Sequence, residues 1–202
     1  MFAESKLRDF IEAVAAKTPT PGGGSVSAAV ASLGAALGIK AARFSEGGIP
    51  QKAAADLEPL KEELLKLVDV DAEAYGQVKS AYGLPKKSDE EKRRRKEVIQ
   101  TALKEAAAVP LQGMRAAVKA LAAILSYAEE SNKNLISDLA GAAIFLEAGT
   151  LGCSLNVKIN AQGLDDKAHA SGLEREAGAL IAEASRLRLE ILKVAEKKYG
   201  AK

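Results

Sequence analysis

An aspartate interrupts an otherwise apolar stripe within residues 51–82. The stripe advances in steps of three and four, as one face of an α-helix does, and consists of Leu60, Leu64, Leu67, Asp71, Tyr75, Val78 and Tyr82. A carboxylate on such a face is partly removed from water, and burial raises the pKa of a carboxyl group toward the range useful for proton transfer. Asp71 is therefore either the anchor of a hydrogen-bond network or an acid–base group, with Tyr75 as its nearest donor.

A second candidate is the uncharged stretch TPTPGGGS, residues 18–25. Pro19 and Pro21 hold the chain extended, and three glycines follow, so a helix is predicted to begin at or just after Gly24. The first N–H groups of a helix can bind an anion, which makes Pro21, Gly22, Gly23, Gly24 and Ser25 candidate substrate-binding residues. The stretch lacks the lysine of a P-loop and a preceding strand, so nucleotide binding is not supported.

The same stretch has a purely structural interpretation. Gly24, Ala28, Ala31, Ala35 and Gly38 recur at helical spacing and form a stripe of small residues, which lets a neighbouring helix approach closely. The residues alone leave both interpretations open.

A third polar group lies at the head of an apolar helix, in SNKNLISD, residues 131–138. Asn134, Ser137 and Asp138 are about one turn apart and share a face. They either cap the start of the helix or contact a substrate.

The basic tract PKKSDEEKRRRKE, residues 85–97, begins another helix. Ser88 and Glu91 have the spacing of a capping box, and most of the remaining charges are expected to face solvent. Lys86 is the one residue of this tract proposed to act in the site.

Composition restricts the class of protein. The 202 residues are 48% hydrophobic, with 29 Lys and Arg against 27 Asp and Glu, so neither a nucleic-acid nor a membrane partner is expected. The run that begins at Pro19 is dominated by Gly, Ala and Ser, which makes membrane insertion weak. Cys153 and His169 are single residues of their kind, which excludes an intrachain disulfide and a Cys/His metal cluster. The cytoplasm is the expected location.

Helical spacing recurs almost everywhere, and the predicted fold is an all-α, single-domain bundle of long antiparallel helices over residues 1–202. The predicted helices span about 2–17, 24–45, 51–82, 88–108, 110–130, 134–152 and 165–198. The last carries a heptad seam of Leu173, Ala177, Leu180, Ala184, Leu187, Ile191 and Val194. This seam packs either within the bundle or between two protomers.

Four segments occur in an order that resembles one family. PTPGGGSVSAAVASLGAALG, DAEAYGQVKSAYGLPKKSDEEKRRRKEVIQTALKEAAAVPL, NKNLISD and LNVKIN are similar to the cyclodeaminase/methenyltetrahydrofolate cyclohydrolase family, which includes the carboxyl-terminal domain of formiminotransferase-cyclodeaminase. The similarity extends to about Asn160. The chain departs from the family at Ser131, where a glycine often precedes NKN.

The resemblance implies an all-helical, dimer-forming enzyme that acts on tetrahydrofolate-bound one-carbon units. The favoured reaction is hydrolysis of methenyltetrahydrofolate; the alternatives are formiminotetrahydrofolate cyclodeamination, served by a separate formiminotransferase, and a non-catalytic helical interaction module. No metal or other prosthetic group is expected, because an acid–base pair suffices for either reaction.

The resemblance also assigns site residues. It places the turn residues Pro21 to Ser25, together with Asp71, Tyr75, Lys86, Asn132, Asn134, Ser137, Asp138, Asn156 and Asn160, at recurrent motif positions of the family. We expect Asp71, Asp138, Tyr75 and Lys86 to be catalytic and the others to bind substrate. Asp71 and Asp138 are predicted to border one folate pocket, within a chain or at a protomer interface, with Tyr75 and Asn134 orienting them.

Overall fold

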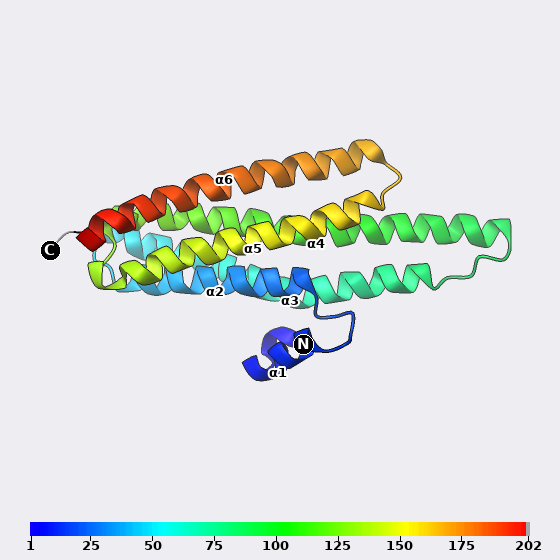
Figure 1. The fold of residues 1–202 in the computed structure, drawn as a ribbon, viewed down its shortest axis with the longest axis horizontal. Helices are drawn as coiled ribbons and strands as arrows, with labels where there is room; N and C mark the ends of the chain where they lie inside the picture. The colour runs from blue at the N-terminus through cyan, green and yellow to red at the C-terminus, as the bar shows by residue number, and fades with distance from the viewer. Residues whose placement is uncertain (201–202) are drawn as a thin grey trace.

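The computed structural model describes residues 1–200 and forms an elongated bundle of helices (Figure 1). Its α-helices are α1 (Leu7–Ala15), α2 (Gly23–Arg43), α3 (Gly48–Tyr82), α4 (Asp89–Tyr127), α5 (Ile136–Gln162) and α6 (Lys167–Gly200). Three single-turn 3-10 helices lie at Phe2–Glu4, Ala128–Glu130 and Lys133–Leu135. No strand occurs within these 200 residues, so the all-α prediction is confirmed.

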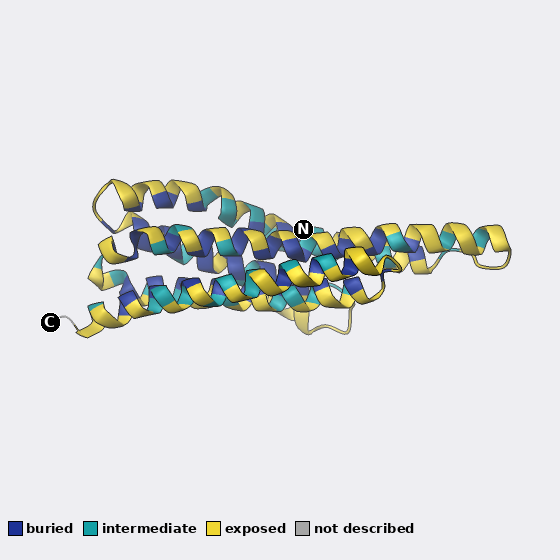
Figure 2. Cartoon of the chain, turned by 90° about the horizontal axis from the view of Figure 1, so that it is seen from above, coloured by how far each residue is buried: buried dark blue, intermediate teal, exposed yellow. Residues whose placement is uncertain are grey.

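The bundle is organised around α2, which packs mainly against α5 and α3; α4 and α6 complete it, and α1 lies apart from the long helices (Figure 1). The far ends of α3 and α4 project beyond the other helices. Figure 2 shows that buried residues gather along the inside of the bundle, whereas this projecting hairpin is mostly exposed.

The small-residue stripe of α2 packs as its structural interpretation predicted. Gly24, Ala28, Ala31, Ala35 and Gly38 are all buried. On the facing helix α5, a Cβ atom added at Gly149 would lie 2.7 Å from the Cβ atom of Ala31. A Cβ atom at Gly152 would overlap the hydroxyl group of Ser27. The backbones of α2 and α5 therefore approach each other too closely for larger residues at these positions.

Three helix predictions were wrong in their boundaries. The helix predicted over residues 2–17 is divided into a 3-10 turn, Phe2–Glu4, and α1. Residues 88–108 and 110–130 belong to one helix, α4, which continues through Pro110. The helix predicted to end near residue 152 continues as α5 to Gln162, and Gly152 lies inside it, packed closely against α2. The capping box at the start of α4 is confirmed: Ser88 Oγ accepts from the Glu91 N–H at 3.1 Å, and the Glu91 carboxylate accepts from the Ser88 N–H.

The heptad seam of α6 is buried inside the chain. All of its members are buried except the half-buried Leu180, and α6 packs on α5 and α4. The alternative in which this seam joins two protomers is therefore wrong.

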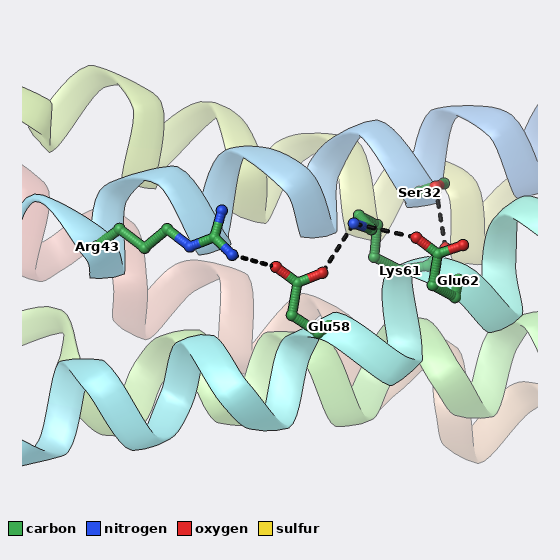
Figure 3. Close-up of polar contacts among 5 residues, drawn as sticks. All are labelled: Ser32, Arg43, Glu58, Lys61 and Glu62. Atoms are coloured by element: carbon green, nitrogen blue, oxygen red, sulfur yellow. Dashed lines mark hydrogen bonds and ion pairs between the residues drawn. The ribbon is translucent and has the colours of Figure 1, made fainter.

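Polar contacts join α2 to α3 away from the core (Figure 3). Glu58 accepts from Arg43 at 2.6 Å and from Lys61 at 2.8 Å, and Lys61 also contacts Glu62 at 3.1 Å. The hydroxyl group of Ser32 donates to the carbonyl oxygen of Lys61 at 3.1 Å. Of these contacts, Arg43–Glu58 and Ser32–Lys61 join α2 to α3, and the other two lie within α3.

Three helical segments are long and apolar enough to cross a membrane, judged by length and composition: Gly23–Arg43, Asp89–Glu130 and Lys133–Gln162. Within the bundle, 56%, 50% and 39% of their most apolar stretches are buried, respectively. The segment that contains α5 thus has the smallest buried share of the three.

Candidate active site

A cavity of about 290 Å³ lies where the turn before α2 meets α3, α4 and α5. Its walls are Pro19, Thr20, Gly22, Gly23, Asp71, Tyr75, Val78, Ala106, Asn156, Ile159 and Asn160. Six of these residues were predicted site residues from three separate segments of the sequence. The fold therefore brings the glycine turn, the interrupted stripe of α3 and the NVKIN segment of α5 together.

Asp71 is held by the first turn of α2. Ser25, which is fully buried, donates its hydroxyl group to Asp71 Oδ2 at 3.0 Å. Burial raises the pKa of Asp71 above its usual range, and hydrogen bonds from the Ser25 hydroxyl and backbone N–H act in the opposite direction. The prediction that Asp71 is partly removed from water is confirmed. The balance leaves a carboxyl group that takes up a proton more readily than an exposed aspartate does.

Gly24 allows this contact, because a Cβ atom at position 24 would overlap the Asp71 carboxylate. The start of α2 was expected to bind an anion. At Ser25 this anion is the carboxylate of Asp71 in the same chain. This differs from the prediction that these N–H groups would serve a substrate, and it assigns Ser25 and Gly24 to positioning Asp71. Gly22 and Gly23 remain in the cavity wall, where a Cβ atom at Gly23 would lie 3.6 Å from Asn156 Nδ2.

Asn160 satisfies a backbone group that Pro110 leaves without a partner. In a regular helix the carbonyl oxygen of Ala106 would accept from the N–H of residue 110, but proline has none. Asn160 Nδ2 donates to this oxygen at 2.9 Å from the neighbouring helix. The contact explains why α4 continues through Pro110. Asn156, one turn earlier on α5, donates to the Gly152 carbonyl oxygen at 3.0 Å.

Tyr75 lines the cavity and is 45% exposed, and no hydrogen bond joins it to Asp71 among the described residues. Lys86 lies in the exposed loop at the tip of the α3–α4 hairpin and does not line the cavity. Its assignment to the same site as Asp71 is wrong within a single chain.

The NKN segment forms a different cluster, at the opposite end of α2. Asn132 donates its side chain to the Phe44 carbonyl oxygen at 2.8 Å and accepts from the Asn134 N–H at 2.9 Å. Asp138 pairs with Lys40 Nζ at 2.6 Å, and Ser137 is exposed beside it. Within one chain, Asp138 therefore does not border the cavity of Asp71, and Lys40, not Asn134, contacts its carboxylate.

Sequence reasoning missed several residues of both groups. The missed residues of the cavity wall are Pro19, Thr20, Val78, Ala106 and Ile159. Of these, only Ile159 could have been inferred, because it lies between the predicted site residues Asn156 and Asn160. Nothing in the sequence indicated Lys40 as the partner of Asp138.

Cys153 is buried and, with Asp71, lines a narrow void. Burial, with a smaller contribution from Asp71, raises the pKa of its thiol group to about 12. Among residues 1–200, no group of three or more His, Cys, Asp or Glu residues could hold a metal ion.

Comparison with known proteins identifies the family. Residues 6–179 match the family model described as formiminotransferase-cyclodeaminase. The chain belongs to this family. It is 36% identical over 208 residues to the methenyltetrahydrofolate cyclohydrolase of Methylorubrum extorquens, an alignment that covers 99% of this chain and all of the relative.

Two further relatives are named as cyclodeaminases. The formimidoyltransferase-cyclodeaminase of Rattus norvegicus is 33% identical over 189 residues, which cover 90% of this chain and 35% of the rat protein. The crystal structure of the formiminotetrahydrofolate cyclodeaminase of Thermotoga maritima superposes with a TM-score of 0.85 at 29% identity, covering 98% of both chains.

Proposed function

We propose that this protein is a methenyltetrahydrofolate cyclohydrolase, with Asp71 as the acid–base group. The observation that carries the proposal is a half-buried carboxylate, with a raised pKa and no paired cation among the described residues, in a cavity wall. The similarity to the Methylorubrum enzyme along the whole chain supports the choice of reaction.

In the substrate, one carbon bridges two nitrogens as a delocalised cation. Water attacks this carbon, and Asp71 accepts the proton that the water releases. The bond from the carbon to the ring nitrogen then breaks as the hydroxyl group of the adduct loses its proton and becomes a carbonyl group. The ring nitrogen takes up a proton in exchange, and the carbon remains on the other nitrogen as a formyl group. The negative charge of Asp71 also stabilises the bridged cation before the attack. Tyr75, on the same wall, has a phenol group that can orient the water.

Formiminotetrahydrofolate cyclodeamination is the second candidate, because the Thermotoga structure of the same fold bears that name. There a folate nitrogen attacks the formimino carbon and ammonia leaves, so Asp71 would move protons between two nitrogens. A separate formiminotransferase would supply the substrate in this case.

The remaining expectations form part of the same proposal: a homodimer in the cytoplasm, with a folate substrate, neither a nucleic-acid nor a membrane partner, and no prosthetic group. Light scattering at micromolar concentration tests the dimer, and a monomer would contradict it.

One assay separates the two reactions. The purified protein is incubated with methenyltetrahydrofolate and, separately, with formiminotetrahydrofolate, and the absorbance of the bridged cation is followed. Its loss, faster than in buffer, indicates the cyclohydrolase, and its appearance from formiminotetrahydrofolate indicates the cyclodeaminase. No change beyond that of buffer with either substrate overturns the proposal.

A further inference from the structure

One face of α3 continues beyond the cavity toward the tip of the α3–α4 hairpin. Tyr75 and Val78 line the cavity, and Tyr82 follows Val78 by one turn on the same face. Tyr75 is 45% exposed and Tyr82 is 51% exposed, so neither ring belongs to the core. Exposed rings in line with a cavity provide a flat, apolar surface for a ligand that extends out of it.

The bundle leaves this face uncovered because α2 does not extend along it. α2 begins at Gly23, close to Asp71, whereas α3 and α4 continue past this level to the end of the hairpin (Figure 1). Most of this projecting part is exposed (Figure 2). The rest of a ligand bound in the cavity can therefore lie along α3, in the place that a longer α2 would occupy.

Arg95 of α4 lies at the far end of this face and contacts Tyr82 in two ways. The central carbon of its guanidinium group is 5.6 Å from the centroid of the Tyr82 ring. Its Nε and Nη2 atoms donate to the Tyr82 carbonyl oxygen at 3.3 Å and 3.0 Å. These contacts hold the guanidinium group in one orientation, and its Nη1 atom has no partner among the described residues.

The neighbours of Arg95 differ from it. The basic tract was expected to face solvent, and Arg93 and Arg94 are exposed, but Arg95 is half-buried. Lys92 pairs with an aspartate at 2.8 Å and Lys96 with another at 2.9 Å, whereas Arg95 has no carboxylate partner in residues 1–200. Arg95 is thus an oriented cation that the chain itself does not neutralise.

Positive charge gathers at this end of the molecule. Residues 79–96 contain eight Lys or Arg against three Asp or Glu, although the whole chain is nearly balanced, with 29 against 27. A guanidinium group presents donors in a planar fork that matches a carboxylate. An oriented guanidinium within a surplus of positive charge is therefore suited to bind a carboxylate of a ligand.

The cavity is small for the proposed substrate. Ligand sites usually enclose about 300–1,000 Å³, and a cavity of about 290 Å³ holds only part of a molecule as large as a folate. The remainder must lie outside the cavity.

The distance along α3 suits the remainder. Tyr82 follows Asp71 by eleven residues, which is about 17 Å along a helix. From ordinary bond lengths, the benzoyl ring and the amide bond of a folate hold the glutamate carboxylates roughly 10–13 Å from the carbon that reacts. A hydrogen bond of about 3 Å at each end completes the span. A folate with its reacting carbon beside Asp71 therefore places its glutamate beside Arg95.

We infer that Arg95, held over Tyr82, is a specificity residue that binds a carboxylate of the glutamate in the folate substrate. The benzoyl ring then lies along α3 between Val78 and Tyr82. The inference rests on the function proposed above and assigns a further contact to the same site. Arg95 also satisfies a carbonyl oxygen at the end of α3, so its test must separate substrate binding from this structural role.

Two substrates and two matched arginine variants make this separation. Methenyltetrahydropteroate lacks the glutamate, and its carboxylate, attached to the benzoyl ring, falls short of Arg95. Arg95→Met is expected to raise KM for methenyltetrahydrofolate at least about tenfold while kcat changes little, and to leave both constants for methenyltetrahydropteroate unchanged. Arg94→Met removes the same charge from an exposed neighbour and is expected to alter neither substrate.

Three results of these kinetics overturn the inference. An equal loss with both substrates means that Arg95 acts only as the end contact of α3. An unchanged KM for methenyltetrahydrofolate in Arg95→Met means that the glutamate lies elsewhere. An equal effect of Arg94→Met means that the total charge of the hairpin matters and the oriented guanidinium does not.

The role of the Tyr82 ring is tested by a conservative rescue. Tyr82→Ala removes the surface that holds the guanidinium group and is expected to raise KM for methenyltetrahydrofolate at least about threefold. Tyr82→Phe keeps the ring and is expected to retain the wild-type KM. Tyr199→Ala, at a 59% exposed tyrosine on α6, is the control. A wild-type KM in Tyr82→Ala contradicts the proposed path along α3.

A binding measurement distinguishes failure of the inference from failure of the proposed function. Isothermal titration calorimetry is performed with folic acid and pteroic acid, which differ by the glutamate. The wild-type protein is expected to bind folic acid at least about tenfold more tightly, and Arg95→Met is expected to lose this preference. If the wild-type protein turns over neither folate but shows this preference, the proposed function fails and the Arg95 contact stands. Equal binding of the two acids by the wild-type protein overturns the contact, whatever the activity.

Discussion

The two ends of α2 hold two aspartates in different ways. Asp71, at the first turn, contacts Ser25, an uncharged donor, and burial raises its pKa. Asp138, near the last turn, pairs with the cation of Lys40. A neutral donor in a half-buried site lets the Asp71 carboxylate take up and release a proton. The same type of side chain is thus suited to proton transfer at one end of the helix, whereas at the other end it forms an ion pair.

The largest expected effect breaks this comparison directly. Asp71→Asn is expected to lower turnover of methenyltetrahydrofolate by about 10,000-fold, because it removes the general base, whereas Asp138→Asn, which lies away from the cavity, is expected to lower it far less. Steady-state kinetics on both variants measure the difference. An equal loss in the two variants would contradict the separate roles.

The stability of Asp71→Asn is expected to rise although its activity falls. An aspartate whose pKa is raised in the folded state makes its favourable contribution only at low pH. This contribution is lost as the pH rises from the unfolded value through the raised folded value. The neutral side chain of Asp71→Asn avoids the cost of burying a charge. Its melting temperature, measured by circular dichroism at a pH above this range, is therefore expected to exceed that of the wild type.

The glycine turn sharpens the comparison at the Asp71 end. Gly24→Ala places a methyl group against the Asp71 carboxylate, and relieving this overlap is expected to cost about 1–3 kcal/mol of stability and to reduce activity. Gly23→Val extends into the cavity and is expected to weaken folate binding while the melting temperature changes little. Unfolding of Gly23→Val would show that this glycine is structural.

Asn160 and Pro110 form a pair that a double-mutant cycle can separate. Asn160→Ala leaves the Ala106 carbonyl oxygen unsatisfied, with an expected loss of about 1–3 kcal/mol in unfolding free energy. Pro110→Ala restores an N–H inside α4, so the double variant is expected to regain stability. If activity stays low in the stable double variant, Asn160 also contacts the substrate. Additive stability losses would contradict the backbone role.

The smallest expected effect is a shift in a pH profile. A base must be ionised to act, so kcat/KM is expected to fall as the pH drops through the Asp71 pKa, which burial raises above the usual range of an aspartate. Ser25→Ala removes a hydrogen bond to the ionised form, which raises this pKa further and moves the acidic limb to higher pH. Lys40→Met, at the other end of α2, is the control and should leave the limb unchanged.

Local features were predictable from the sequence, and contacts between distant segments were not. The stripe around Asp71 and the capping box of Ser88 and Glu91 depend on spacings of three and four residues, which the sequence displays directly. The break predicted between residues 108 and 110 does not occur, because Asn160 on another helix supplies the donor that replaces the missing N–H of Pro110. The helix predicted to end near residue 152 continues to Gln162, and Gly152 inside it packs on Ser27, which is far away in sequence.

The candidate site was predictable in part for the same reason. The glycine turn, Asp71 and the Asn156–Asn160 segment converge because α2, α3 and α5 are neighbours. The NKN segment was assigned to the same pocket, but it lies just before the start of α5 at Ile136, whereas Asn156 and Asn160 lie near the other end of that helix. The sequence does not give the direction of each helix in the bundle. Polar residues from several segments were therefore all assigned to one site, although they lie at two ends of the bundle.

The close packing of α2 on α5 at Gly149 and Gly152 has a mechanical consequence. Because backbone and Cβ atoms already touch there, α2 cannot tilt or slide without displacing α5, and it behaves as a stiff rod with Ser25 near one end and Lys40 near the other. A methyl group added at the middle of the rod, as in Gly149→Ala, would displace both ends together. Both aspartates would then lose their alignment, although the change touches neither of them.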